Sequence, residues 1–259
     1  MESICADLVA EHAALDVVVD TLDAASFDRP TPAAGWSVRD QVSHLWFFDQ
    51  KARLALTDPD AFADDAVALI AAGGTEASVV PGRTMSSADL VAAWRRDRAA
   101  LVAAALSVDP SSRVPWYGPA MAPRSFITAR LMETWAHGQD IADTVGIDRE
   151  PTDRLRHVAH IGVRARPFSY MLHGLELPTD DVHVVLAAPG DGSWEWGASE
   201  TQMVSGPALD FCLVVTQRRH LDDTALVIEG EGAREWIGIA QAFAGGIGSG
   251  RMPTEHPPT

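Results

Sequence analysis

The stretch Arg130-Leu-Met-Glu-Thr-Trp-Ala-His-Gly-Gln-Asp140 carries the most informative pattern of residues in this chain. Glu133 and His137 stand four residues apart, so on a helix they lie one turn apart on the same face. Asp140, seven residues after Glu133, falls on that face too. A carboxylate and an imidazole so placed can bind one metal ion, or they can form an ordinary ion pair. Spacing alone favours the ion pair, so a metal site requires a third ligand from elsewhere in the chain.

The helical pattern of this stretch extends over the first two thirds of the sequence. Six segments have helical periodicity or helix-start signals: residues 2–24, 37–57, 61–72, 86–106, 125–146 and 152–172. Between the third and fourth of them, residues 73–83 form a connection interrupted by glycine and proline. At least four of the helices are long and amphipathic, which is typical of a four-helix bundle with at least one long connection. We therefore predict a helical bundle domain over residues 1–176.

The pattern changes after Pro178. Residues 182–186, 192–197 and 225–228 are strand-like, whereas residues 207–216 and 233–244 favour helices. The glycine-rich segment from residue 245 and the proline-rich end are expected to form a flexible tail. Residues 177–259 are therefore predicted to form a small α+β domain, so the fold class is α plus α+β.

Composition limits the partners and the location of the protein. The 259 residues carry a formal net charge of −16, which argues against a nucleic-acid partner or an anionic membrane. The N-terminus lacks the pattern of a signal peptide, and no apolar run reaches the length of a transmembrane helix. The two cysteines, Cys5 and Cys212, lie far apart and indicate no disulfide framework. We expect a cytoplasmic protein, monomer or homodimer, that acts on a small-molecule substrate.

The third ligand that a metal site requires is available in His44. This histidine lies inside the predicted helix 37–57, whose start resembles a capping box because Ser37 is followed three residues later by Asp40. Helix bundles build metal sites from side chains that project inward from facing helices. His44, Glu133 and His137 make a set of two histidines and one glutamate. Catalytic zinc commonly has three protein ligands and an open fourth position, although nickel or iron also suits these donors.

Two motifs in these helices resemble a known family. The stretch Gly35-Trp-Ser-Val-Arg-Asp-Gln-Val-Ser-His-Leu45 is similar to the signature of the DinB-like metal-binding bundles, and Glu133-Thr-Trp-Ala-His-Gly-Gln-Asp-Ile141 is similar to its second half. The branch most similar is the actinobacterial group related to mycothiol-dependent maleylpyruvate isomerase. More weakly, the stretch that starts at Trp236 resembles an uncharacterised subgroup of that branch.

The resemblance implies a DinB-like bundle followed by a small C-terminal domain. It also implies that His44, Glu133 and His137 hold a divalent metal, in the first place Zn²⁺. The metal would activate a low-molecular-weight thiol such as mycothiol, used as cosubstrate, for transfer or isomerisation. In that branch an arginine of the C-terminal domain helps to hold an anionic group of the ligand. Arg218 is the candidate counterpart, although the adjacent Arg219 leaves the alignment ambiguous, and a solvated helix end explains both equally well.

Other polar and aromatic residues permit two interpretations each. Asp140 either accepts a hydrogen bond from a ligating histidine or is a surface acid. Trp116 and Tyr117 either line a pocket or simply pack within their proline-rich loop. Asp49 and Arg53, four residues apart, are placed to pair along their helix.

Two functions fit these observations. The first is a metal-dependent thiol transferase or isomerase, which agrees with the lack of a recognisable protein nucleophile motif. The second is a non-catalytic metal- or ligand-binding protein with the same three residues, which a fourth protein ligand such as His157 or His160 would support. Neither the substrate nor the reaction follows from the sequence.

Overall fold

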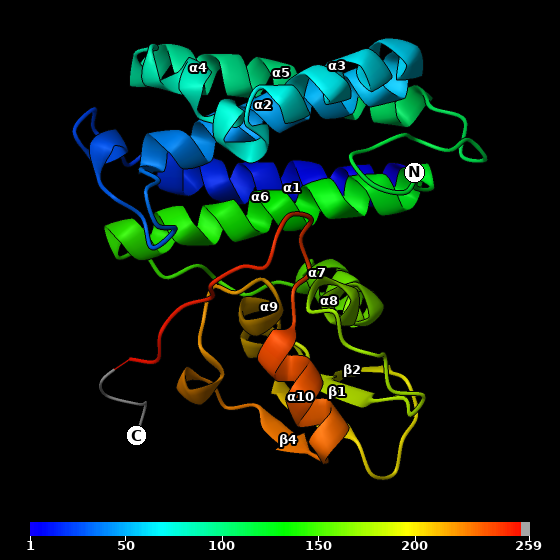
Figure 1. The fold of residues 1–259 in the computed structure, drawn as a ribbon. Helices are drawn as coiled ribbons and strands as arrows, with labels where there is room; N and C mark the ends of the chain where they lie inside the picture. The colour runs from blue at the N-terminus through cyan, green and yellow to red at the C-terminus, as the bar shows by residue number, and fades with distance from the viewer. Residues whose placement is uncertain (255–259) are drawn as a thin grey trace. The chain divides into compact units, whose positions relative to one another are not determined.

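A computed structural model describes residues 1–254 of the chain, and it divides into two compact units, Met1–Arg149 and Glu150–Thr259 (Figure 1). The proline-rich end beyond residue 254, for which a tail was expected, lies outside the described residues. Within the described residues, no helix is both long enough and apolar enough to cross a membrane.

The first unit is a helical bundle, as predicted. Its four long helices are α1 (Glu2–Val19), α2 (Val38–Thr57), α5 (Ser87–Ser107) and α6 (Pro123–Val145). Helix α1 packs against α5 and α6, and α2 packs against the same two helices, so the four close a ring around one core (Figure 1). The long connection between α2 and α5 holds α3 (Pro59–Ala71), η2 (Gly74–Ser78) and α4 (Val80–Arg83). A short helix, η1 (Ser26–Asp28), lies between α1 and α2.

Helix α2 begins where the sequence predicts it. Ser37 accepts a hydrogen bond from the backbone of Asp40, and the Asp40 carboxylate accepts one from the backbone of Ser37, which completes a capping box. Asp40 is also paired with Arg83 of α4, at 2.8 Å. Behind this helix start, Leu45 of α2 and Trp94 of α5 are fully buried in the core. Burial of such side chains stabilises the fold by roughly 1.5–3 kcal/mol each.

Up to residue 254, where the described part of the chain ends, the second unit combines four helices with a small sheet. Its helices are α7 (Leu155–Arg164), α8 (Arg166–Leu172), α9 (Ala208–Val215) and α10 (Glu231–Ile239), with a short η3 (Leu221–Asp223). Its strands are β1 (His183–Ala187), β2 (Ser193–Trp196), β3 (Met203–Pro207) and β4 (Val227–Glu229). The strand order is β2-β1-β3-β4, in which β1 and β3 are parallel and both outer pairs are antiparallel. The predicted α+β class is confirmed.

Two details of this unit differ from the sequence prediction. The single helix expected over residues 152–172 is two helices, because Pro167 lacks an N–H and its ring cannot follow the backbone of a continuous helix. Strand β3 was not predicted, because Gly206 and Pro207 end a segment without clear alternation.

The contacts also divide the chain earlier than the change of pattern at residue 177. Helices α7 and α8 belong to the second unit because α7 packs against α9 and α8 packs against α10. The end of the helical pattern and the end of the bundle are therefore different boundaries.

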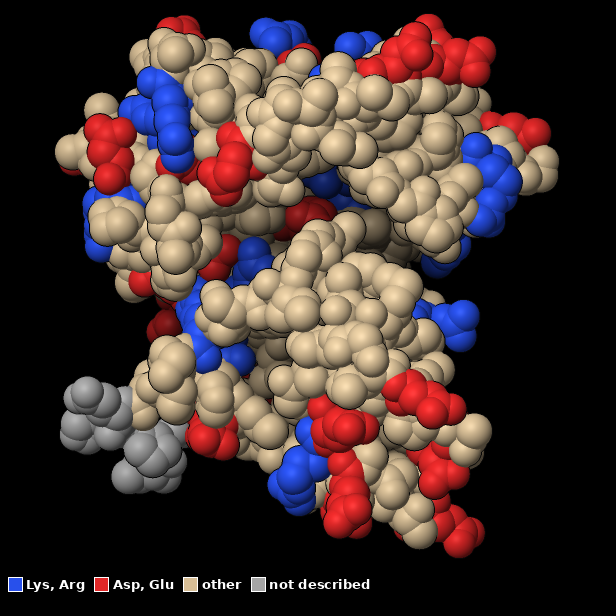
Figure 2. Space-filling model, in the orientation of Figure 1, with Lys and Arg blue, Asp and Glu red and all other residues tan. Residues whose placement is uncertain are grey.

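The surface reflects the negative charge of the chain. Figure 2 shows Asp and Glu side chains on both units, with Lys and Arg dispersed among them. Three aspartates at the start of α3 and along it are exposed: Asp58, Asp60 and Asp64. Many basic residues elsewhere form ion pairs with acidic residues, as Arg95 does with Asp16 at 2.9 Å.

Candidate metal centre

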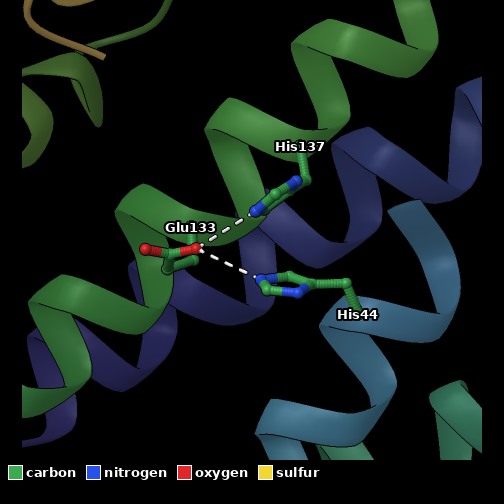
Figure 3. Close-up of side chains that lie close together, drawn as sticks. All are labelled: His44, Glu133 and His137. Atoms are coloured by element: carbon green, nitrogen blue, oxygen red, sulfur yellow. Dashed lines mark hydrogen bonds and ion pairs between the residues drawn. The ribbon is translucent and has the colours of Figure 1, made fainter. Parts of the chain in front are cut away.

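Three side chains from two helices meet inside the first unit. His44 projects from α2, and Glu133 and His137 project from α6, so that one oxygen of Glu133 faces both imidazole rings (Figure 3). Glu133 Oε2 lies 3.2 Å from His137 Nε2 and 3.8 Å from His44 Nε2. One ligand atom from each residue lies within 4.8 Å of the others. The spacing of Glu133 and His137 therefore does place them on one face, and α2 brings His44 to it.

The three residues are shielded to different degrees. His44 is 6% exposed and His137 8% exposed, while the side chain of Glu133 retains 20% of its exposure. Glu133 is thus the most exposed of the three residues. A carboxylate and two imidazoles that meet in this way form a set of three donors, which is one donor fewer than a tetrahedral metal ion takes.

Ser78 determines which nitrogen of His44 carries the proton. The Ser78 hydroxyl donates its only proton to the carbonyl oxygen of Thr75, at 2.6 Å. Ser78 Oγ therefore meets His44 Nδ1, 2.9 Å away, as an acceptor, which assigns the imidazole proton to Nδ1. The lone pair of His44 Nε2 is then directed at the space beside Glu133.

Gln41 does the same for His137. The Thr31 hydroxyl donates to the carbonyl oxygen of Trp36 at 2.9 Å, so it accepts from Gln41 Nε2 at 3.0 Å. This orients the amide so that Gln41 Oε1 faces His137 Nδ1 at 2.5 Å and accepts its proton. Nε2 of His137 is therefore also left with a free lone pair toward Glu133. Ligating histidines usually donate their other N–H in this way.

The charges in the site favour a cation between the three residues. Burial and the neighbouring His137 lower the pKa of His44 to about 3, so this ring is neutral at pH 7. Two imidazole lone pairs and a carboxylate oxygen thus converge with no proton assigned between them. These donors suit a divalent cation such as Zn²⁺.

Aromatic side chains surround the two imidazoles. The ring of Phe48 lies 4.7 Å from that of His44, and the indole of Trp36 lies 5.0 Å from His44 and 6.0 Å from His137, nearly parallel to the latter. Gly35, at φ +81°, adopts the left-handed conformation that turns the chain into Trp36. The rings leave the imidazoles little freedom to rotate.

Comparison with known proteins places this site in a family. A model of the family described as the mycothiol maleylpyruvate isomerase N-terminal domain matches residues 8–142, just over half of the chain. The chain belongs to this family. Two uncharacterised proteins from two strains of Mycobacterium tuberculosis are each 43% identical to it over 249 residues, which cover 95% of this chain and 97% of theirs. The family domain contains all three residues of the metal centre.

Solved structures of the family share the fold of both units. The mycothiol-dependent maleylpyruvate isomerase superposes with a TM-score of 0.58 at 14% sequence identity, over 89% of this chain and 95% of that chain. A histidine-to-alanine mutant of that enzyme superposes with a TM-score of 0.59 at 15% identity and the same coverage. A helical DinB-like domain followed by a small α+β domain is therefore the fold of this chain, as the sequence predicted.

The remaining candidates lie outside the cluster of three. Asp140 is buried, one turn beyond His137 on α6, but the Nδ1 nitrogen of His137 faces Gln41. Arg218 belongs to the second unit, where it donates to the carbonyl oxygen of Thr216 at 2.6 Å and lies over the ring of Phe243. The roles predicted for Asp140 and Arg218 remain predictions.

Two other expectations have structural outcomes. Trp116 stacks on Phe62 at 5.4 Å, and Tyr117 packs beside both rings, which is the packing interpretation. Asp49 does not pair with Arg53 along α2 but with Arg130 of α6, at 2.9 Å, in the bundle core. A buried carboxylate is stabilised by a cation that is buried beside it, and Arg130 is buried whereas Arg53 is exposed.

Sequence reasoning missed the residues that orient the two histidines. These are Thr31, Gln41, Thr75 and Ser78. Gln41 had one available signal, since it stands three residues before His44, on the same face of α2. Ser78 had none, because it lies in a connection that has no periodicity.

Proposed function

We propose that this chain is a divalent-metal-dependent enzyme that uses a low-molecular-weight thiol, of which mycothiol is the leading candidate, in a transfer or isomerisation reaction. The observation that carries the proposal is the convergence of the Nε2 lone pairs of His44 and His137 on the Glu133 carboxylate. Support for the thiol comes from the family, which is named for the mycothiol-dependent maleylpyruvate isomerase.

The three residues have defined tasks in this proposal. His44, Glu133 and His137 hold the cation, and a divalent ion bound there would lower the pKa of a thiol or water and polarise a carbonyl oxygen. Glu133, the most exposed of the three, borders the side from which the thiol enters. Ser78 and Gln41 keep both rings in the tautomer that the cation requires.

The protein itself offers no reactive thiol for this chemistry. Both cysteines are buried, and burial raises the pKa of the Cys212 thiol far above its ordinary value. A buried thiol in an apolar environment is unreactive. The nucleophile is therefore expected from the cosubstrate.

Metal content tests the proposal first. Purified wild-type protein should hold one divalent ion per chain by elemental mass spectrometry, whereas His44→Ala and Glu133→Gln should lose it. His183→Ala is the matched control, because His183 forms an ordinary ion pair with Glu195 at 3.5 Å in the second unit. Equal metal content in His44→Ala and wild type would refute the site.

A second measurement separates the enzyme from a non-catalytic metal-binding protein. Cobalt(II) is loaded in place of the native ion, and mycothiol is added while the absorption spectrum is recorded. An enzyme of the proposed type should show a new sulfur-to-metal band that saturates with mycothiol. A stoichiometric metal whose spectrum no thiol changes would favour the non-catalytic alternative.

A further inference from the structure

Trp36 is the partly exposed member of the aromatic surroundings of the metal centre. Its indole contacts the imidazoles of both His44 and His137, at 5.0 and 6.0 Å between ring centroids. Phe48 also contacts His44, but it is only 8% exposed and belongs to the core. Trp36 is half-buried and so has one part against the ligands and another toward solvent. Trp36 is therefore an aromatic side chain that both contacts the two histidines and is partly accessible to solvent.

A single short segment holds this indole and one of the ligands. Trp36 Nε1 donates to Glu76 Oε1 at 3.2 Å, and Glu76 lies on η2. Ser78, on the same segment, accepts from His44 Nδ1. Gly73 precedes η2 with a φ of +104°, a left-handed conformation that favours glycine and sets the direction of the segment. The indole is therefore anchored relative to the metal ligands rather than free to rotate away.

We propose that Trp36 is a specificity-determining wall of the metal centre, positioned by Glu76, that selects thiols with little bulk next to the sulfur. This inference rests on the proposed function, because it assumes that a thiol binds at the cation. The physical reason is steric: branches on the carbon that bears the sulfur would meet the indole, which Glu76 keeps in place. In an unbranched thiol, hydrogens take the place of these branches, so the contact with the indole is avoided.

Two thiols that differ by two methyl groups on the carbon that bears the sulfur test the wall. Cobalt(II)-loaded protein, at saturating cobalt, is titrated with ethanethiol and with 2-methyl-2-propanethiol, and both dissociation constants are read from the sulfur-to-cobalt absorption band. The wild type should prefer ethanethiol. Trp36→Ala should reduce that preference by about tenfold, the discrimination that a few methyl groups typically confer, and Trp36→Phe should reduce it less.

Trp46 supplies the matched control. It is also partly buried, and its Nε1 also donates to a carboxylate, that of Asp97, at 2.7 Å, but it faces α5 and contacts neither imidazole. Trp46→Phe should leave the ratio of the two dissociation constants unchanged. Glu76→Ala should lower the ratio, whereas Glu76→Gln keeps an oxygen for the indole N–H and should preserve it.

The outcomes distinguish this inference from the proposed function. If the wild type binds cobalt but neither thiol, the proposed function fails and the inference falls with it. If the wild type binds both thiols and Trp36→Ala and Trp36→Phe keep its ratio, only the inference is refuted. A change of ratio in Trp46→Phe as large as in Trp36→Phe would refute it too, because the effect would then be general.

Discussion

Ser78→Ala is the sharpest test of the way in which this fold prepares His44 for a metal ion. Ser78 is fully buried and accepts from His44 Nδ1 at 2.9 Å, and the variant removes this acceptor while it adds no atoms. The buried N–H then lacks a partner, at a cost of about 1–3 kcal/mol. The ring can avoid the cost by carrying its proton on Nε2, where it faces Glu133 at 3.8 Å.

That change of tautomer is what weakens metal binding. A proton on Nε2 has to move to Nδ1 before His44 can donate its Nε2 lone pair to the metal, and in the variant the Nδ1–H then lacks its acceptor. Loss of such an orienting partner typically lowers metal affinity by about 10–100-fold, equivalent to about 1.4–2.7 kcal/mol. Ser78→Ala should fall within this range.

The assay is a competition for Zn²⁺ between the protein and a chelating dye, with folding checked by circular dichroism. Ser169→Ala is the matched control, since Ser169 is 1% exposed and its hydroxyl accepts from the backbone of Gln241 at 3.0 Å in the second unit. It should lose stability but not zinc affinity. A folded Ser78→Ala protein with wild-type zinc affinity would refute the tautomer argument.

Two further predictions concern the bundle core. Arg130→Met leaves the Asp49 carboxylate buried without the guanidinium that lies 2.9 Å away. The free energy of unfolding, measured in urea, should fall by about 3–5 kcal/mol, and the second substitution Asp49→Leu should restore part of that loss. Burial, with Arg98 and Arg130, lowers the pKa of His12 to about 3, so the folded state keeps this ring neutral. The unfolded chain binds this proton below about pH 6.5, so the free energy of unfolding should fall as the pH drops from 6.5 toward 3. The fall should be smaller in His12→Gln, and identical pH profiles for the variant and the wild type would contradict this.

The grouping of His44, Glu133 and His137 could be predicted because each position depends on local structure. Glu133 and His137 share a face of α6 through the helical repeat alone, and Ser37 and Asp40 start α2 at a place that leaves His44 inside it. Two amphipathic helices of one bundle then pack face to face. The expected set of donors followed without knowledge of any long-range contact.

Elements without a local signal could not be predicted. Strand β3 has a weak pattern of its own and is stabilised by β1 on one side and β4 on the other, which are distant in sequence. The partner of Asp49 could not be predicted either. The sequence suggests Arg53, four residues away, whereas the packing of α6 against α2 places Arg130 beside Asp49 in the core.

Helical periodicity and capping act over a few residues, so the helices of the bundle and the positions of the three donors follow from the sequence. The orientation of the two histidine rings depends instead on contacts between distant segments. Ser78 reaches His44 across 34 residues, Gln41 reaches His137 across 96, and Glu76 anchors Trp36 across 40. Each hydrogen bond needs two segments to meet at a defined distance and angle, and this depends on the packing of the whole bundle.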